Sequence, residues 1–209
     1  PDRLKRSRIH PIALLLAHAT YSVGRGMRGQ NTWAPIPSIV DALEEAFYKA
    51  FEFVEPTENR YLLGLDVSGS MSMCTVAGTP LSACAASTAM AMVTMQTEPY
   101  CMPMAFADQF RAIPLTKRMR LSDAMLHTQA VNFGGTDCAL PMEYARKHKL
   151  EIDTFVVYTD NETWSGRIHP AQALMEYRQA TGIPAKLVVM GMCSNGFSIA
   201  NPVDPGMLD

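Results

Sequence analysis

After residue 60 the sequence alternates short apolar runs with helical patterns, and this alternation limits the fold more than any other feature. The apolar runs are YLLGLD, YCMPMAFAD, TFVVYTD and AKLVVMG, and the segments between them include PLSACAASTAMAMVTM and PAQALMEYRQATG. Runs that are apolar at nearly every position are buried on both faces, which is typical of a parallel sheet covered by helices. The sequence therefore predicts an α/β domain with a doubly wound, mainly parallel sheet flanked by helices, of the Rossmann-like kind.

The part of the chain before this alternation has a different pattern. HPIALLLAHATYSV places Pro11 in a first helical turn, and SIVDALEEAFYKAFEFV repeats apolar residues at helical spacing before Pro56. We expect two amphipathic helices joined by the segment GRGMRGQNTWAPIP. The predicted division is a helical segment over residues 1–57 and an α/β domain over residues 58–209.

The run YLLGLD ends abruptly in polar side chains, in the stretch LLGLDVSGSMS. Asp66, Ser68 and Ser70 alternate there, and alternate side chains at a strand end point to one side, so their oxygens can converge. Doubly wound sheets bind ligands beyond the carboxyl ends of their strands. TFVVYTD ends at that edge in Asp160, and FGGTDC supplies Thr136 after two glycines that let the backbone approach closely.

These five oxygen donors, two of them carboxylates, suit a hard divalent cation. Mg²⁺ fits best because it is octahedral, keeps waters and avoids sulfur and imidazole ligands, and Mn²⁺ and Ca²⁺ are the alternatives. Each piece alone has a simpler explanation: an Asx-type turn for DxSxS, a helix cap for Thr136 and a loop carboxylate for Asp160. All three together, each after a strand or a glycine turn, favour the metal site.

The set Asp66-x-Ser68-x-Ser70, Thr136 and Asp160 resembles, at every position, the metal-ion-dependent adhesion site of von Willebrand factor type A domains. The resemblance implies that the two serines and the threonine contact the metal and that the aspartates act directly or through water. It also implies that one coordination position stays free for a carboxylate of a partner.

Longer strings resemble the carboxyl-terminal half of the Ro autoantigen family of RNA-binding proteins. These strings are FGGTDCALPM, YTDNETW, HPAQALMEYR, IPAKLVVMGM and SNGFSIANPVDPGMLD, and RIHPIALLLAHATYSVGRGMRG resembles the helical segment just before that half. The resemblance covers essentially the whole chain. It implies a von Willebrand factor A domain that follows the last helices of a ring of helical repeats and that ends here before the family's last strand and helix.

In that family the ring binds small Y RNAs on its outer surface and receives the ends of misfolded noncoding RNAs in its hole. The resemblance therefore implies an RNA-binding ribonucleoprotein component whose A domain offers its Mg-type site to an acidic protein partner. Two alternatives remain, a protein-binding A domain unrelated to RNA and a Mg²⁺-dependent phosphoester hydrolase.

Charge is distributed unevenly along the chain, although the net charge is only -2. Residues 1–40 hold six Lys or Arg against one Asp, whereas the residues after 60 hold ten against thirteen Asp or Glu. Contacts to a polyanion are therefore expected at the amino-terminal end, where Arg25 and Arg28 are the candidate RNA contacts, from charge only. A solvated basic face explains the same residues.

The sequence gives little support to an enzymatic function. No His neighbours Asp66, no GxSxG surrounds the serines, and no second Asp follows two residues after Asp66 as in phosphatase-like pairs. GRGMRG matches GxGxxG, but it follows a helix rather than a strand, so it does not predict nucleotide binding. We therefore predict a binding module rather than a catalyst.

The cysteines and the apolar runs bear on location. Five cysteines, odd in number and without a CxxC pair, fit neither a zinc knuckle nor a closed disulfide framework and indicate a reducing compartment. No apolar run reaches the ~18 residues of a membrane helix, and no signal peptide is visible. The expected location is the cytoplasm, with the nucleus as a second compartment and no membrane partner.

Overall fold

Six strands form a single sheet at the centre of the computed structural model, which describes residues 9–26, 30–52, 54–76, 79–131, 134–161, 165–193 and 196–209. Their order in the sheet is β3-β2-β1-β4-β5-β6. The strands are β1 (Arg60–Asp66), β2 (Tyr100–Phe106), β3 (Phe110–Ala112), β4 (Thr154–Thr159), β5 (Lys186–Gly191) and β6 (Met207–Leu208). Neighbouring strands are parallel except β2 and β3. The predicted α/β fold with a mainly parallel sheet is confirmed.

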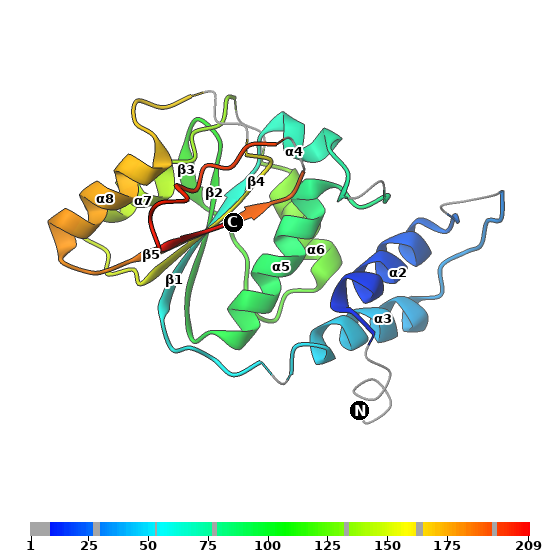
Figure 1. Ribbon diagram of the computed structural model, residues 1–209. Helices are drawn as coiled ribbons and strands as arrows, with labels where there is room; N and C mark the ends of the chain where they lie inside the picture. Colours follow the sequence, from blue (N-terminus) through cyan, green and yellow to red (C-terminus); the bar gives the residue numbers. More distant parts are fainter. Residues whose placement is uncertain are drawn as a thin grey trace.

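Helices cover both faces of the sheet (Figure 1). One face carries α7 (Leu140–Lys147) and α8 (Pro170–Thr181), and the other carries α5 (Ala83–Thr97) and α6 (Leu121–Gln129). Successive residues of β1 point to the two cores: Leu62 packs with Phe155 beneath α8, whereas Leu63 packs with Met92 of α5. Burial on both faces explains why these strands are apolar at nearly every position.

The amino-terminal helices pair with each other and pack against α5 (Figure 1). They are α2 (Pro11–Val23) and α3 (Pro37–Lys49). Leu15 and Phe47 are buried against Ala89 of α5. Both helices were predicted, but the second ends at Lys49 rather than near Pro56, because the chain turns there and Phe51 packs edge-on against Phe47.

Gly24 ends α2 in the left-handed conformation, with φ of 72°. A side chain at this position would lie 2.5 Å from the carbonyl oxygen of Trp33, so the close return of the chain also requires glycine. The first glycine of GRGMRG therefore terminates a helix. Residues 27–29 of that motif lie outside the described residues.

Two edge strands were not predicted from the sequence. β3 has three residues and β6 has two, and both contain exposed positions. Strands this short show no clear alternation of apolar and polar residues, so the pattern carries little signal. The antiparallel β3 makes the sheet mixed rather than wholly parallel.

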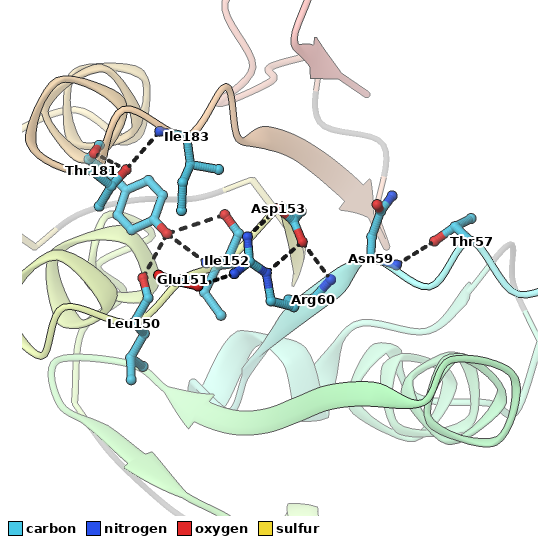
Figure 2. A network of polar contacts seen from close by, with 10 residues as sticks. Thr57, Asn59, Arg60, Leu150, Glu151, Ile152, Asp153, Thr181 and Ile183 are labelled. Carbon is cyan, nitrogen blue, oxygen red and sulfur yellow. Dashed lines mark hydrogen bonds and ion pairs between the residues drawn. The ribbon is translucent and has the colours of Figure 1, made fainter.

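A polar network holds the beginnings of β1 and β4 together (Figure 2). The Arg60 side chain donates hydrogen bonds to both carboxylate oxygens of Asp153, at 2.8 and 2.7 Å, and also contacts Glu151. The Tyr177 hydroxyl, from α8, accepts from the Ile152 amide and donates to the Leu150 carbonyl oxygen, each at 2.7 Å. These bonds fix the register of β4 beside β1 at the edge opposite the strands' carboxyl ends.

One pair of cysteines is bonded, which the sequence analysis did not predict. A disulfide joins Cys74, at the end of the short helix α4 (Gly69–Met73), to Cys193, after β5. Cys84, Cys101 and Cys138 are free thiols. None of the helices in the described ranges is both long and apolar enough to cross a membrane.

Candidate metal centre

The predicted site forms where the two central strands end. β1 and β4 are parallel neighbours, and Leu65 lies opposite Tyr158, so Asp66 reaches the level of Thr159. The Thr159 hydroxyl donates a hydrogen bond of 2.8 Å to Asp66 Oδ2. The negative charge of Asp160, the next residue, also acts on Asp66. The strand order therefore brings together two carboxylates that lie far apart in the sequence.

The chain after Asp66 turns so that two serines follow the carboxylate closely. The Ser68 amide donates to Asp66 Oδ1 at 2.9 Å, which is an Asx-type turn, and Ser68 then occupies the N-cap position of α4 without a side-chain capping bond. The hydroxyl oxygens of Ser68 and Ser70 lie 3.0 Å apart. The DxSxS stretch thus forms the turn that its simpler explanation requires and also places its two hydroxyls side by side.

Thr136 lies between the ends of the strands on either side of β1. The amide of the following residue, Asp137, donates to the Ala107 carbonyl oxygen after β2, and the Ser165 amide, beyond β4, donates to the Thr136 carbonyl oxygen. These two bonds attach the chain around Thr136 to the segments that follow β2 and β4, the two neighbours of β1. Thr136 is buried, and it is not the cap of α7, whose cap is Ala139.

The glycines before Thr136 let two side chains approach the backbone closely. A side chain at Gly135 would lie 2.2 Å from the Ser165 hydroxyl oxygen, and one at Gly134 would lie 2.6 Å from Asp108 Oδ2. A Cβ atom at either position would therefore require the Ser165 or Asp108 side chain to move. This is the role that the sequence analysis gave to the glycines in FGGTDC.

Burial makes it costly for the two carboxylates of the site to be charged at the same time. Asp66 has no exposed surface and Asp160 is 4% exposed. Burial raises the pKa of Asp66 from 3.8 to about 6; hydrogen bonds from Ser68 and Thr159 oppose this shift, and the nearby charge of Asp160 adds to it. Two buried carboxylates close together repel each other, and a bound cation would remove that repulsion.

The donor set fits a hard cation through hydroxyl oxygens as well as carboxylates. Within the described ranges, no group of three or more His, Cys, Asp and Glu residues is arranged to hold a metal ion. A cation here would depend on Asp66, Asp160 and the hydroxyls of Ser68, Ser70 and Thr136. Such oxygen ligands suit Mg²⁺, Mn²⁺ or Ca²⁺ rather than zinc. Metal binding by these residues stays a prediction.

Two residues at this site were missed by the sequence analysis. Thr159 is buried and orients Asp66, but in TFVVYTD it counts as one more residue of a buried strand. Asn161 has a left-handed φ of 65°, and its buried Oδ1 atom makes no hydrogen bond in the part of the chain that the structure describes. Asn is among the residues that tolerate the left-handed conformation, so the string TDN could have indicated a turn with positive φ at Asn161.

Arg25, one of the two candidate RNA contacts, is separate from this site in the fold. Arg25 is exposed in the connection between α2 and α3, where it forms an isolated β-bridge with Thr32. Arg28 lies outside the described residues. The proposal for these two residues therefore rests on charge alone.

Comparison with known proteins identifies the domain. A family model described as the Ro60 vWA domain matches residues 60–209. The chain belongs to this family. It is 50% identical over 210 residues to "RNA-binding protein RO60" of Deinococcus radiodurans and 47% identical over 209 residues to the protein of the same name of Caenorhabditis elegans.

The solved structure of a Ro protein has the same fold. The crystal structure of Deinococcus radiodurans RO (RSR) protein matches all of this chain with a TM-score of 0.85 and 51% identity. The chain spans 42% of that protein's chain, and 40% and 32% of the two curated relatives. The predicted membership of the Ro family is confirmed, and the match covers the helical segment as well as the Ro60 vWA domain.

Proposed function

We propose that this chain is the metal-dependent binding module of an RNA-binding Ro protein. The observation that carries the metal proposal is the convergence at Asp66, where Thr159, Ser68 and the charge of Asp160 meet one buried carboxylate. When bound, Mg²⁺ would supply an open coordination position for the carboxylate of an acidic protein partner. The five predicted side chains would hold it.

Binding, rather than hydrolysis, has the better support. Three of the five histidines have other roles: His10 and His169 accept hydrogen bonds from helix amides, and His148 stacks on Tyr144. A hydrolase would need a general base within hydrogen-bonding reach of its nucleophile. Turnover of a generic phosphoester that is lost in Asp66→Ala would instead favour the alternative of a Mg²⁺-dependent hydrolase.

The RNA part of the proposal is supported by the relatives, two of which are named RNA-binding proteins. For the whole protein we propose small noncoding Y RNAs and misfolded RNAs as ligands. Phosphate contacts dominate affinity for RNA, and the Ro60 vWA domain is slightly acidic. We therefore expect this chain alone to bind RNA weakly, with a shallow dependence on salt.

A thermal unfolding series with Mg²⁺ tests the metal site. At a hundredfold excess over Kd, Mg²⁺ should stabilise the protein by about 2.7 kcal/mol, or roughly 5–10 °C in Tm for a chain of this size. The Asp66→Ala and Ser70→Ala variants should lose most of this rise. Ser72→Ala is the matched control, because Ser72 is an exposed serine on the same short helix. An equal rise in all four proteins would overturn the assignment.

Filter binding over a range of salt, with and without chelator, tests the RNA proposal. The wild type should bind small structured RNA weakly, the pair Arg25→Glu and Arg28→Glu should weaken it further, and chelator should change little. RNA binding that disappears in Asp160→Ala would show instead that the metal centre contacts the RNA. No binding of any RNA at low salt would favour the alternative of a protein-binding A domain unrelated to RNA.

A further inference from the structure

A groove of about 860 Å³ lies beside α7, on the face of the sheet opposite α5 and α6. Phe110 of β3 and Tyr144 and His148 of the α7 region contribute its aromatic surface, and Arg146 and Lys147 contribute its positive charge. Its size is within the roughly 300–1,000 Å³ of ligand pockets. None of these residues belongs to the metal centre.

Three rings form a continuous column along this groove. The ring centroids of Phe110 and Tyr144 are 4.9 Å apart, and those of Tyr144 and His148 are 4.2 Å apart. Phe110 and Tyr144 are half-buried, whereas His148 is exposed at the end of α7. The inner rings are held by the core, so the column presents an aromatic ring to solvent in a fixed position. Stacking on such rings is how proteins bind the bases of single-stranded RNA.

A group of three positive charges lies close to the last two rings of this column in the sequence. Arg146, Lys147 and Lys149 lie within four residues, and Arg146 is held by an ion pair of 2.6 Å with Glu176. In the described ranges, Lys147 and Lys149 make no ion pair or side-chain hydrogen bond. One carboxylate, that of Glu143, also lines the groove.

Two other arginines of the domain are neutralised by close carboxylates. Arg60 pairs with Asp153 and Arg178 with Asp204. Cations at a helix carboxyl end also stabilise the helix, which explains Arg146 and Lys147. That explanation does not extend to Lys149, which lies beyond the end of α7. Lys147 lines the groove, and Lys149 directly follows His148, so both cations are near the ring on which a base would stack.

We propose that this groove binds a nucleotide of single-stranded RNA. The base stacks on the ring column at His148, and the neighbouring phosphates contact Lys147 and Lys149. The inference rests on the proposed RNA-binding function and adds a second contact region to it, distinct from Arg25 and Arg28. The small net negative charge of the domain does not prevent this RNA contact, because the contact depends on the positive charges close to the groove.

Fluorescence anisotropy with a labelled, unpaired RNA of about ten nucleotides tests the groove. His148→Ala should raise Kd about tenfold with an unchanged salt slope, because it removes stacking and no lysine. His148→Trp should restore binding. Lys147→Ala combined with Lys149→Ala should weaken binding and reduce the slope of log K against log salt by about 1.4, or roughly 0.7 for each lost phosphate contact on a single strand.

The matched control is Arg118→Ala, which removes an exposed cation beside α5, on the other face of the sheet. It should bind like the wild type. Duplex RNA of the same length should compete poorly, because its bases are already stacked. Every substituted side chain is exposed, so the variants should keep the wild-type Tm.

Three outcomes would contradict the proposal that the groove binds RNA. If the groove variants bind like the wild type while Arg25→Glu with Arg28→Glu lowers affinity, the groove fails and the RNA-binding function stands. If no protein in the series binds RNA, both the groove proposal and the proposed RNA-binding function are wrong. If polyglutamate displaces the RNA from the wild type in spite of its negative charge and His148→Ala has no effect, the lysines serve a protein partner instead.

Discussion

Thr159 donates a hydrogen bond of 2.8 Å to Asp66 Oδ2, which joins the ends of two neighbouring strands across 93 residues of sequence. The other oxygen of Asp66 accepts from the Ser68 amide at 2.9 Å. Both oxygens of this buried carboxylate are therefore oriented before any cation binds. Preorganisation of this kind is what a metal site needs from the residues around its ligands.

Thr159→Val should weaken Mg²⁺ binding and the fold together. The substitution keeps the shape of the side chain but leaves a buried carboxylate oxygen without its donor, which costs about 1–3 kcal/mol. Metal affinity should fall about tenfold, in the range found for residues that orient metal ligands. Denaturant unfolding and Mg²⁺ titration of the same samples measure both effects. Thr154→Val, at the buried start of the same strand, should leave the Mg²⁺ affinity unchanged.

The ion pair between Arg60 and Asp153 should make stability fall in acid. Hydrogen bonds from Arg60 hold the pKa of Asp153 below its ordinary value of 3.8. The pair is therefore fully stabilising above that ordinary value, and its contribution disappears as pH falls through the lowered pKa. Asp153→Asn should be less stable than the wild type at pH 7, and the difference should narrow towards pH 2. A difference that stays constant with pH would exclude this linkage.

Gly64→Ala should destabilise the fold by about 1–3 kcal/mol, as overpacking in a core does. A Cβ atom at Gly64 in β1 would lie 2.9 Å from the ring of Pro141, where α7 packs against the sheet. Gly69→Ala is the control, because a Cβ atom there meets nothing within 4 Å. Urea unfolding should separate the two variants, and equal stabilities would show that α7 moves away without cost.

The disulfide between Cys74 and Cys193 should stabilise the chain. Closing a loop of 119 residues restricts the unfolded state, and disulfides typically contribute about 2–4 kcal/mol. Cys74→Ser, Cys193→Ser and the double variant should lower Tm equally. Adding a reductant should lower the Tm of the wild type and leave the Tm of the three variants unchanged. Alkylation of both thiols in the untreated native protein would show that the bond does not form in solution.

Most of the fold could be predicted from apolar periodicity, because β1, β2, β4 and β5 and the helices between them bury large apolar surfaces. The edge strands β3 and β6 could not be, since two or three residues show no period. At the site, Asp66, Ser68 and Ser70 follow one another closely enough for their geometry to be inferred. The role of Thr159 depends on which strand pairs with β1, and sheet order is a long-range property that this pattern does not contain.

The strand order also has a consequence for the chain during synthesis. β1 can pair with β2 early, but its other edge needs β4, which ends 93 residues after Asp66. At roughly 5–20 residues per second, translation leaves that edge of β1 unpaired for about 5–20 s. During this interval an apolar strand has an open hydrogen-bonding edge, and Asp66 lacks the hydroxyl that orients it. A nascent chain of this family is thus most exposed to misassembly while the ribosome is still making the residues between β2 and β4.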